Sequence, residues 1–390
     1  MPRKVEDWIE GFLEYTSNTE PRESYRRWVA ISTIASALQR KCRLVWGTET
    51  FYPNEYIILV GPPAARKGTA MRAGKYFLDR LGIPRAADES SRQKLVKSLK
   101  EAMVPDATNE GRINYHASLS LQCTELTVFL GYDSKELISM LCKWYDCEDR
   151  YIYDTIQRGK EEIANVWVNL LGATTPGQLQ AALPIAAISS GFTSRIVFVY
   201  EEDKERMVIE PFLTPAQQVL EEDLYIDLGE IRSLCGDFTV DTDFRGLYTA
   251  WRTDSESRQL FADSRLDYYV QRRPTHLFKL AMICSAARRS DLLVTRDDLA
   301  SAIAMLENVE RKMINVFRGV GANPLASVQM RVMSLLEVEH ELSLANLQGQ
   351  FFSDVSRRDL GEVLSTIEAM GLCHIDMVKR RVVSTKQKSM

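Results

Sequence analysis

The hydrophobic positions in the first part of the chain predict two helices followed by strands. Within residues 5–42, apolar side chains recur every three or four positions on either side of the polar segment 21–24, which is the spacing of amphipathic helices. Residues 42–46 and the region of Phe51 predict a short β pair. Tyr56–Val60 is an apolar and aromatic run rich in β-branched residues, which is typical of a strand buried on both faces.

The same periodicities predict alternating helices and strands through the middle of the chain. The expected elements are helices at 91–103 and 134–144, a loop at 104–115, and strands at 116–123, 151–156, 161–171 and 196–200. A turn centred on Gly159 separates two of these strands and predicts a β-hairpin. Residues 201–265 are acidic and of mixed polarity, so we expect a connector that is exposed at 201–206.

The last third of the chain predicts a helical lid and then a separate small domain. One helix is expected to open at Arg272, and a second, capped by Thr295, to run to about Phe317. Small residues at Gly319–Pro324 predict a hinge. Beyond the hinge, the expected order is three helices (327–339, 343–351, 356–370) and a β-wing (373–378, 381–384), which is a winged-helix pattern.

We therefore expect an α/β protein with four parts. They are an N-terminal helical segment (1–46), a P-loop ATPase core (47–205), a connector with a helical lid (206–320) and a winged-helix domain (325–390).

Composition narrows the class of protein. The chain has 390 residues, of which 45% are hydrophobic and 26% charged, as is usual for globular proteins that can bury a sizeable core. Its net charge of −4 gives no global basic field, so any contact with DNA has to be local. Seven scattered cysteines without a C-x-x-C pair indicate a reducing compartment and no structural zinc site. No run reaches membrane-spanning length, and we expect a cytoplasmic protein.

The segment after the buried strand is similar to a phosphate-binding loop. The consensus is G-x-x-x-x-G-K-[ST], and Gly61 and Lys67 have its spacing. Arg66 replaces the second glycine, Gly68 replaces the hydroxyl residue, and Thr69 comes one position late. The predicted nucleotide contacts are Gly61, Arg66, Lys67, Gly68, Thr69 and Ala70. The alternative is an ordinary strand, turn and helix with a surface lysine.

Polar residues at the ends of neighbouring strands are the candidates for chemistry. Glu125 follows the strand 116–123 and could activate water or hold Mg²⁺, together with Thr69, although a second acid is missing beside it. Thr174 follows the next core strand and could sense the γ-phosphate. Arg195 precedes a strand and could act on a neighbouring subunit's nucleotide. The alternatives are a solvated glutamate and a surface ion pair.

Local basic residues are the candidates for nucleic-acid contact. Arg158 and Lys160 lie at the tip of the predicted hairpin, which could also be a solvated turn. In the predicted winged helix the candidates are Arg357, Arg358, Lys379 and Arg380. Such domains also dock proteins, and both interpretations of this one remain open.

The order of these features resembles the AAA+ and superfamily 3-like ATPase modules of phage and mobile-element primase–helicases. It is more distantly similar to minichromosome-maintenance helicases. The segments that carry the resemblance are 53–56 with the loop, 172–176 and 191–195. The resemblance implies an arginine finger at Arg195, a lid sensor at Arg272 or Arg273, and a pore hairpin that grips single-stranded DNA through Arg158 and Lys160.

The function that this resemblance implies is an ATP- and Mg²⁺-dependent DNA helicase or translocase that forms a ring, as a hexamer, during replication of a phage or mobile element. Its partners would be single-stranded DNA, origin DNA and a separate primase or polymerase, because no primase segment precedes the ATPase. The first alternative is an initiator or helicase loader that binds ATP and DNA without unwinding. The second is a DNA-binding regulator that has lost nucleotide chemistry.

Overall fold

The computed structural model describes residues 3–86, 91–107, 113–131, 135–155, 159–182, 191–317, 325–352, 354–376 and 378–385. The chain divides into two compact units, Met1–Arg318 and Gly319–Met390. The predicted hinge at 319–324 lies outside the described residues. No helix among the described residues is long and apolar enough to cross a membrane.

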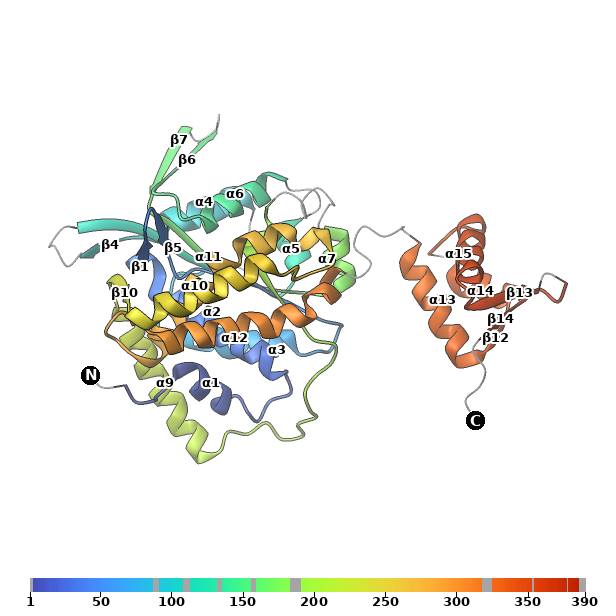
Figure 1. Ribbon diagram of the computed structural model, residues 1–390, viewed down its shortest axis with the longest axis horizontal. Coiled ribbons are helices and arrows are strands. Elements are labelled where there is room, and N and C mark those ends of the chain that lie inside the picture. Colours follow the sequence, from blue (N-terminus) through green and yellow to red (C-terminus); the bar gives the residue numbers. More distant parts are fainter. Residues whose placement is uncertain are drawn as a thin grey trace. The chain divides into compact units, whose positions relative to one another are not determined.

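The first unit is mixed α/β and is built on a five-stranded sheet with the order β4-β5-β8-β3-β9 (Figure 1). Its strands are β3 (Tyr56–Val60), β4 (Met103–Ala107), β5 (Ile113–Cys123), β8 (Val166–Thr174) and β9 (Ile196–Tyr200). β3 is parallel to β8 and β9, β5 is parallel to β8, and β4 is antiparallel. Every residue of β3 and β8 is buried, as the apolar run Tyr56–Val60 predicts.

The register aligns the ends of the central strands. Val60 pairs with Thr174 on one side and with Tyr200 on the other, so three carboxyl ends meet at one edge of the sheet. The strands that follow β3 in the sequence first lie on one side of it (β4, β5 and β8), and the last strand, β9, lies on its other side. In open α/β sheets, ligands bind beside the carboxyl ends of strands where the order reverses in this way. We call this the carboxyl edge, and the opposite one the amino edge.

Helices from both ends of the first unit enclose this sheet. The mostly buried helix α2 packs on β3, β8 and β9 and on its neighbours α3, α9 and α11. The helices of this unit are α1 (Trp8–Tyr15), α2 (Glu23–Leu38), α3 (Lys67–Arg80), α4 (Arg92–Glu101), α5 (Leu126–Leu130), α6 (Lys135–Tyr145), α7 (Pro176–Ala182), α9 (Pro215–Ser233), α10 (Thr242–Ser257), α11 (Asp267–Arg288) and α12 (Arg296–Met313). Short 3₁₀ turns are η1 (Gln39–Lys41), η2 (Thr193–Arg195), η3 (Ser264–Leu266) and η4 (Ile314–Phe317).

A second sheet joins segments that the sequence assigned to different parts. Its order is β11-β10-β1-β2, formed by β1 (Cys42–Trp46), β2 (Glu49–Phe51), β10 (Gly236–Val240) and β11 (Leu293–Val294). β1 pairs in parallel with β10. The segments 1–46, 47–205 and 206–318 therefore pack within one compact unit.

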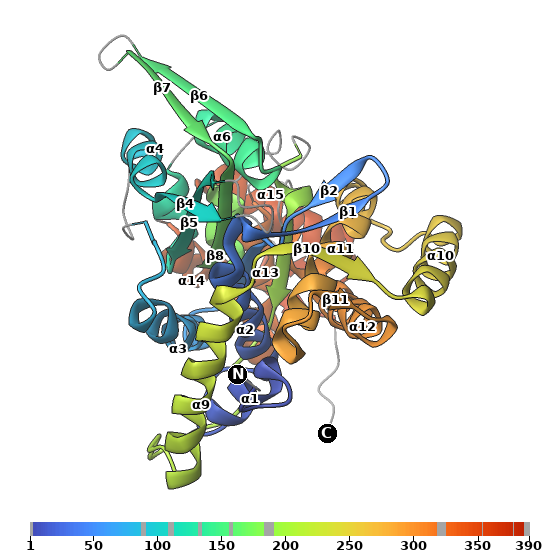
Figure 2. The same cartoon turned by 90° about the vertical axis from the view of Figure 1, so that its left-hand side faces the viewer.

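A two-stranded hairpin extends away from the body of the first unit (Figure 2). It consists of β6 (Arg150–Thr155) and β7 (Gly159–Ala164). The sequence predicted one returning strand at 161–171 that includes a core strand at 166–171. The core strand is confirmed as β8, but the continuous strand is wrong, because it is interrupted at Asn165, which has a positive φ of 49°. The break lets β7 belong to the hairpin while β8 enters the central sheet.

Other predictions are wrong in the regions of mixed polarity. Residues 103–107 form β4 at the edge of the sheet, where a loop was expected. Residues 201–265, for which the sequence indicated only mixed polarity and an exposed connector at 201–206, contain the long helices α9 and α10. Helix α11 begins five residues before Arg272 and continues through Pro274. Thr295 caps α12 through the Asp298 backbone N–H, as predicted.

In the part of the second unit that the structure describes, three helices and a three-stranded sheet surround an apolar core of their own. Its elements are α13 (Ala326–Glu339), β12 (Glu341–Ser343), α14 (Leu344–Phe351), α15 (Arg357–Ala369), β13 (Cys373–Asp376) and β14 (Arg381–Ser384). The strand order is β12-β14-β13, with every pair antiparallel. β12, which the sequence did not predict, lies at the edge of this sheet.

Candidate functional site

The loop between β3 and α3 has a left-handed residue where the phosphate-loop consensus has its second glycine. Arg66 has φ 63° and ψ 24°. Glycine adopts this region readily, whereas other residues lose roughly 1–2 kcal/mol in it. Arg66 therefore takes, at the position of the second consensus glycine, a backbone conformation that glycine adopts more readily.

The first consensus glycine is required by packing beneath the loop. A Cβ built at Gly61 would lie 2.4 Å from the Tyr25 hydroxyl oxygen and 2.5 Å from the Glu201 carbonyl oxygen. The Tyr25 hydroxyl donates to the Val60 carbonyl at 2.7 Å and so fixes the end of β3. Ala70 is buried in the first turns of α3. Gly61 and Ala70 therefore shape the loop, and other residues line the space beside it.

A pocket of about 550 Å³ opens beside this loop at the carboxyl edge. Its lining joins residues from the loop, from the start of α3, and from the segments that follow β5 and β8. Predicted and unpredicted residues meet in it: Arg66, Lys67, Thr69, Glu125, Thr174 and Gln178. Strands far apart in the sequence thus bring the predicted lysine, glutamate and threonine to one site.

Lys67 is the principal cation in this pocket. Its ammonium donates to the carbonyl oxygens of Gly61 at 2.7 Å and Pro62 at 2.9 Å. Burial lowers the pKa of Lys67, and the negative charge of Glu125 partly opposes that shift. The ammonium is held inside the loop, where a phosphate oxygen could replace the two carbonyls as its partner.

Gln178 is a pocket residue that the sequence analysis missed. Its Nε2 donates to the Glu125 carboxylate at 3.3 Å, and its Oε1 accepts from the Thr175 hydroxyl at 3.1 Å. Gln178 thus links the acid after β5 to the segment after β8. Gln178 lies three residues after Thr175 at the start of a helix, and this spacing could have predicted its contact with Thr175. The sequence carries no such signal for its contact with Glu125.

The pocket also offers oxygen ligands suitable for Mg²⁺. The Thr69 hydroxyl accepts from Arg72 at 3.2 Å, and Glu125 supplies a carboxylate. Among the residues that the structure describes, no group of three or more His, Cys, Asp or Glu side chains is placed to hold a metal ion. A cation in this pocket would therefore take few of its ligands from acidic side chains of the described residues.

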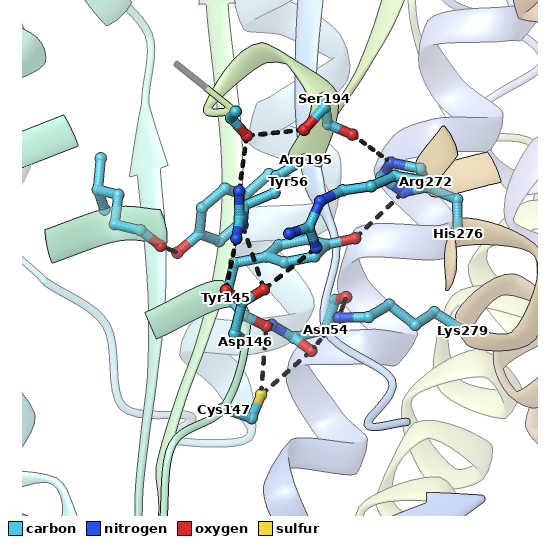
Figure 3. A network of polar contacts seen from close by, with 12 residues as sticks. Asn54, Tyr56, Tyr145, Asp146, Cys147, Ser194, Arg195, Arg272, His276 and Lys279 are labelled. Carbon is cyan, nitrogen blue, oxygen red and sulfur yellow. Dashed lines mark hydrogen bonds and ion pairs between the residues drawn. The ribbon is translucent and has the colours of Figure 1, made fainter. Parts of the chain in front are cut away.

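Arg195 lies at the amino edge, away from the pocket of its own chain. It directly precedes Ile196, which pairs with Tyr56 at the start of β3. A five-residue strand separates the two edges by about 15 Å. Arg195 Nη2 contacts Asp146 Oδ2 at 2.5 Å, and Nη1 donates to the Gly191 carbonyl at 2.8 Å (Figure 3).

The arginine pair of α11, predicted as a lid sensor, has two different roles. Arg272 Nη1 contacts Asp146 Oδ1 at 3.2 Å, beside Arg195. Arg273 is buried and makes a two-point ion pair with Glu310, at 2.7 and 2.9 Å. Neither arginine lines the loop pocket among the described residues. Their role as a lid sensor that contacts nucleotide stays a prediction.

A buried polar network lies next to Arg195 (Figure 3). His276 binds the Glu55 carboxylate at 2.9 Å and the Ser194 carbonyl at 3.0 Å. Lys279 donates to Asn54 Oδ1 at 2.6 Å, and burial lowers the pKa of this lysine. The network ties the segment before β9 to the segment before β3, and the sequence analysis missed it because its members are distant in the chain.

The described nucleic-acid candidates are exposed side chains at three places. Lys160 is on β7, while its predicted partner Arg158 lies outside the described residues. Arg357 and Arg358 are in the first turn of α15. Lys379 and Arg380 occupy the turn between β13 and β14. Arg358 lies 3.8 Å from Glu362, and Lys379 lies 4.0 Å from Asp376, so part of this charge is compensated locally.

Comparisons with known proteins assign no family to this site. A scan against models of protein families finds no match, and the search of curated proteins finds no relative of the chain.

Proposed function

We propose that this protein is an ATPase that binds MgATP at the pocket beside the β3–α3 loop. The observation that carries the proposal is the convergence of Lys67, Glu125 and Thr174 on one pocket at the carboxyl edge. Lys67 would offset the charge of the β- and γ-phosphates, and Thr69 with Glu125 would hold Mg²⁺. Glu125, oriented by Gln178, would activate the attacking water.

We further propose that the ATPase works as a ring and drives movement along DNA, as a helicase or translocase. Arg195 supports the ring, because it lies at the edge opposite the pocket and would reach only the nucleotide of a neighbouring copy. The extended β6–β7 hairpin supports a DNA-gripping element, with Lys160 near its tip. The order of helices and strands in the second unit supports a winged helix that binds DNA or docks a protein.

An initiator or helicase loader that binds ATP without unwinding is the second candidate. Two observations favour it over a fast motor. Lys67 is bonded to carbonyls of its own loop, and Gly68 places no hydroxyl directly after the lysine. Both features favour slow exchange or slow hydrolysis, as expected when nucleotide acts as an assembly switch.

The first experiment separates nucleotide binding from hydrolysis. Lys67→Ala should abolish binding of a fluorescent ATP analogue, whereas Glu125→Gln should keep binding and stop phosphate release. Lys94→Ala, an exposed lysine on α4, is the matched control and should behave as wild type. Unchanged turnover in both site variants would refute the ATPase assignment.

The second experiment separates the motor from the switch. Strand displacement of forked DNA with ATP and Mg²⁺, beside a mass measurement of the oligomer, distinguishes a helicase from a loader. Mixing Arg195→Ala with Lys67→Ala subunits should restore part of the hydrolysis, since each defect lies on a different side of a shared site. Mixed oligomers that stay inactive would show that Arg195 does not act on a neighbour's nucleotide.

A further inference from the structure

The segment between β9 and α9, residues 203–212, presents apolar side chains to solvent from an anchored backbone. Met207 is 72% exposed, Ile209 82% and Phe212 73%. The Asn18 side chain donates to the carbonyls of Glu210 at 3.2 Å and Phe212 at 2.9 Å, so these exposed residues do not belong to a loose loop. Large exposed apolar side chains held in a fixed arrangement are typical of protein interaction sites.

The same segment is connected to the phosphate loop through one carboxylate. Glu20 Oε2 contacts Arg66 Nε at 2.5 Å, and Glu20 Oε1 contacts Lys204 Nζ at 2.5 Å. The backbone N–H of Glu205 donates to the Glu20 carbonyl at 2.9 Å. Hydrogen bonding from Lys204 lowers the pKa of Glu20, which therefore stays ionised between the two cations. Arg66 lines the pocket, so the chain of contacts runs from the nucleotide site to the exposed segment.

The position of the segment indicates which partner would cover it. β9 ends at Tyr200 directly beside Val60, so the segment leaves the sheet at the carboxyl edge, next to the pocket. Under the proposed function, a second copy must approach this edge with Arg195 and Arg272. Two exposed carboxylates, Glu202 directly before the segment and Glu210 within it, could pair with those two arginines, whose charge Asp146 compensates in part.

We propose that residues 203–212 dock a second copy of this chain, and that the Arg66–Glu20–Lys204 contacts couple this docking to nucleotide in the adjoining pocket. The inference rests on the proposed nucleotide site and adds to it the surface that the neighbouring copy contacts. Phosphate binding would draw Arg66 away from Glu20, which would change how Glu20 holds Lys204 and the docking segment. Contact between unlike surfaces of identical chains can close into a ring.

The first test removes the apolar contacts and leaves the pocket intact. The triple variant Met207→Ser, Ile209→Ser, Phe212→Ser should bind a fluorescent ATP analogue as wild type does, yet remain monomeric by mass photometry. Its ATP turnover should fall to the level of Arg195→Ala. The matched control Phe352→Ser, a phenylalanine 81% exposed in the second unit, should assemble normally.

The second test addresses the coupling. In wild type, the analogue should lower the concentration for half-assembly by about tenfold. Glu20→Gln removes the charge that Arg66 and Lys204 share, and should reduce this shift to less than about threefold. Lys204→Gln should have a similar effect through the other side of the carboxylate.

These outcomes separate the two proposals. Failure of wild type to bind nucleotide refutes the proposed function. Normal binding together with wild-type assembly of the triple variant refutes the docking surface, and a different protein would then be its occupant. An unchanged nucleotide shift in Glu20→Gln refutes the coupling, and a wild-type chain that is monomeric with nucleotide refutes both the ring and this inference.

Discussion

Arg272 and Arg273 are adjacent on α11, and we expect their replacement to have different effects on stability. Arg273 is 4% exposed and its partner Glu310 is 3% exposed. Tyr269 donates a further hydrogen bond to Glu310 at 3.0 Å, and the Arg273 guanidinium lies 5.0 Å from the centre of the Trp251 ring. Replacing Arg273 with Met leaves a buried, unpaired carboxylate. The expected loss is about 3–5 kcal/mol in the free energy of unfolding.

The corresponding fall in melting temperature follows from the size of the unit. The entropy of unfolding is about 2.1 cal/mol/K per residue, or about 0.7 kcal/mol/K for residues 1–318. Arg273→Met should therefore lower Tm by about 4–7 °C in calorimetry. The double variant Arg273→Met, Glu310→Met should recover part of this loss, because it removes the unpaired charge as well.

Arg272→Met is the matched control on the same helix. Arg272 is 30% exposed and shares Asp146 with Arg195, so its removal should change stability by less than about 1 kcal/mol. It should instead reduce ATP turnover if the amino edge serves a neighbouring copy. The reasoning is refuted if Arg273→Met retains wild-type stability in chemical denaturation but loses nucleotide binding, because Arg273 would then be a ligand contact.

Three further predictions concern the loop and the hairpin. Arg66→Gly with Gly68→Ser restores the consensus, and a Cβ at Gly68 would meet no atom within 4 Å beyond its chain neighbours and the backbone of its own helix. Steady-state ATP turnover should therefore rise about tenfold, which corresponds to a barrier lower by about 1.4 kcal/mol. Burial lowers the pKa of Lys67 below its ordinary 10.5. The affinity for an ATP analogue should therefore fall as the pH rises toward the lowered pKa and the ammonium loses its proton. Lys67→Arg should keep its affinity to higher pH. Replacing Arg158 and Lys160 with Ala should reduce the salt dependence of single-strand binding, measured by anisotropy, by about 1.4 in log–log slope, with DNA-independent hydrolysis unchanged.

The sequence predicted those parts of the site that depend on local patterns. A buried apolar run followed by Gly61 and Lys67 indicates a strand, a loop and a helix, and the structure has these elements. Glu125 and Thr174 were chosen because each follows a predicted core strand. Parallel strands bring their carboxyl ends to one edge, so both residues line the same pocket.

Other features depend on tertiary contacts that no local pattern reveals. Arg272 and Arg273 are adjacent in the chain, but neighbouring helical positions point about 100° apart, so one reaches the surface and the other the core. Their environments could be assigned only after the packing of α11 was known. The pairing of Gln178 with Glu125 likewise joins segments after two different strands.

One missed element did carry a local signal. Helix α9 lies within the region that was interpreted as a connector, yet it has a complete capping box. The Thr214 hydroxyl accepts a hydrogen bond from the Gln217 backbone N–H, and the Gln217 side-chain oxygen accepts one from the Thr214 backbone N–H. Pro215 occupies the first helical position. The acidic composition around it obscured these residues. Capping residues were a better guide here than average polarity.

The departure from the consensus at Arg66 bears on the proposed coupling between the loop and the docking segment. A glycine there would take the left-handed conformation without strain but could contact nothing beyond the loop. An arginine loses roughly 1–2 kcal/mol in that conformation, and in return its guanidinium reaches Glu20 outside the pocket. If the loop binds phosphate as proposed, a glycine at this position would serve that binding alone, whereas Arg66 also contacts Glu20 outside the pocket. A chain that uses nucleotide to control assembly would retain this substitution, and a chain selected only for rapid turnover would lose it.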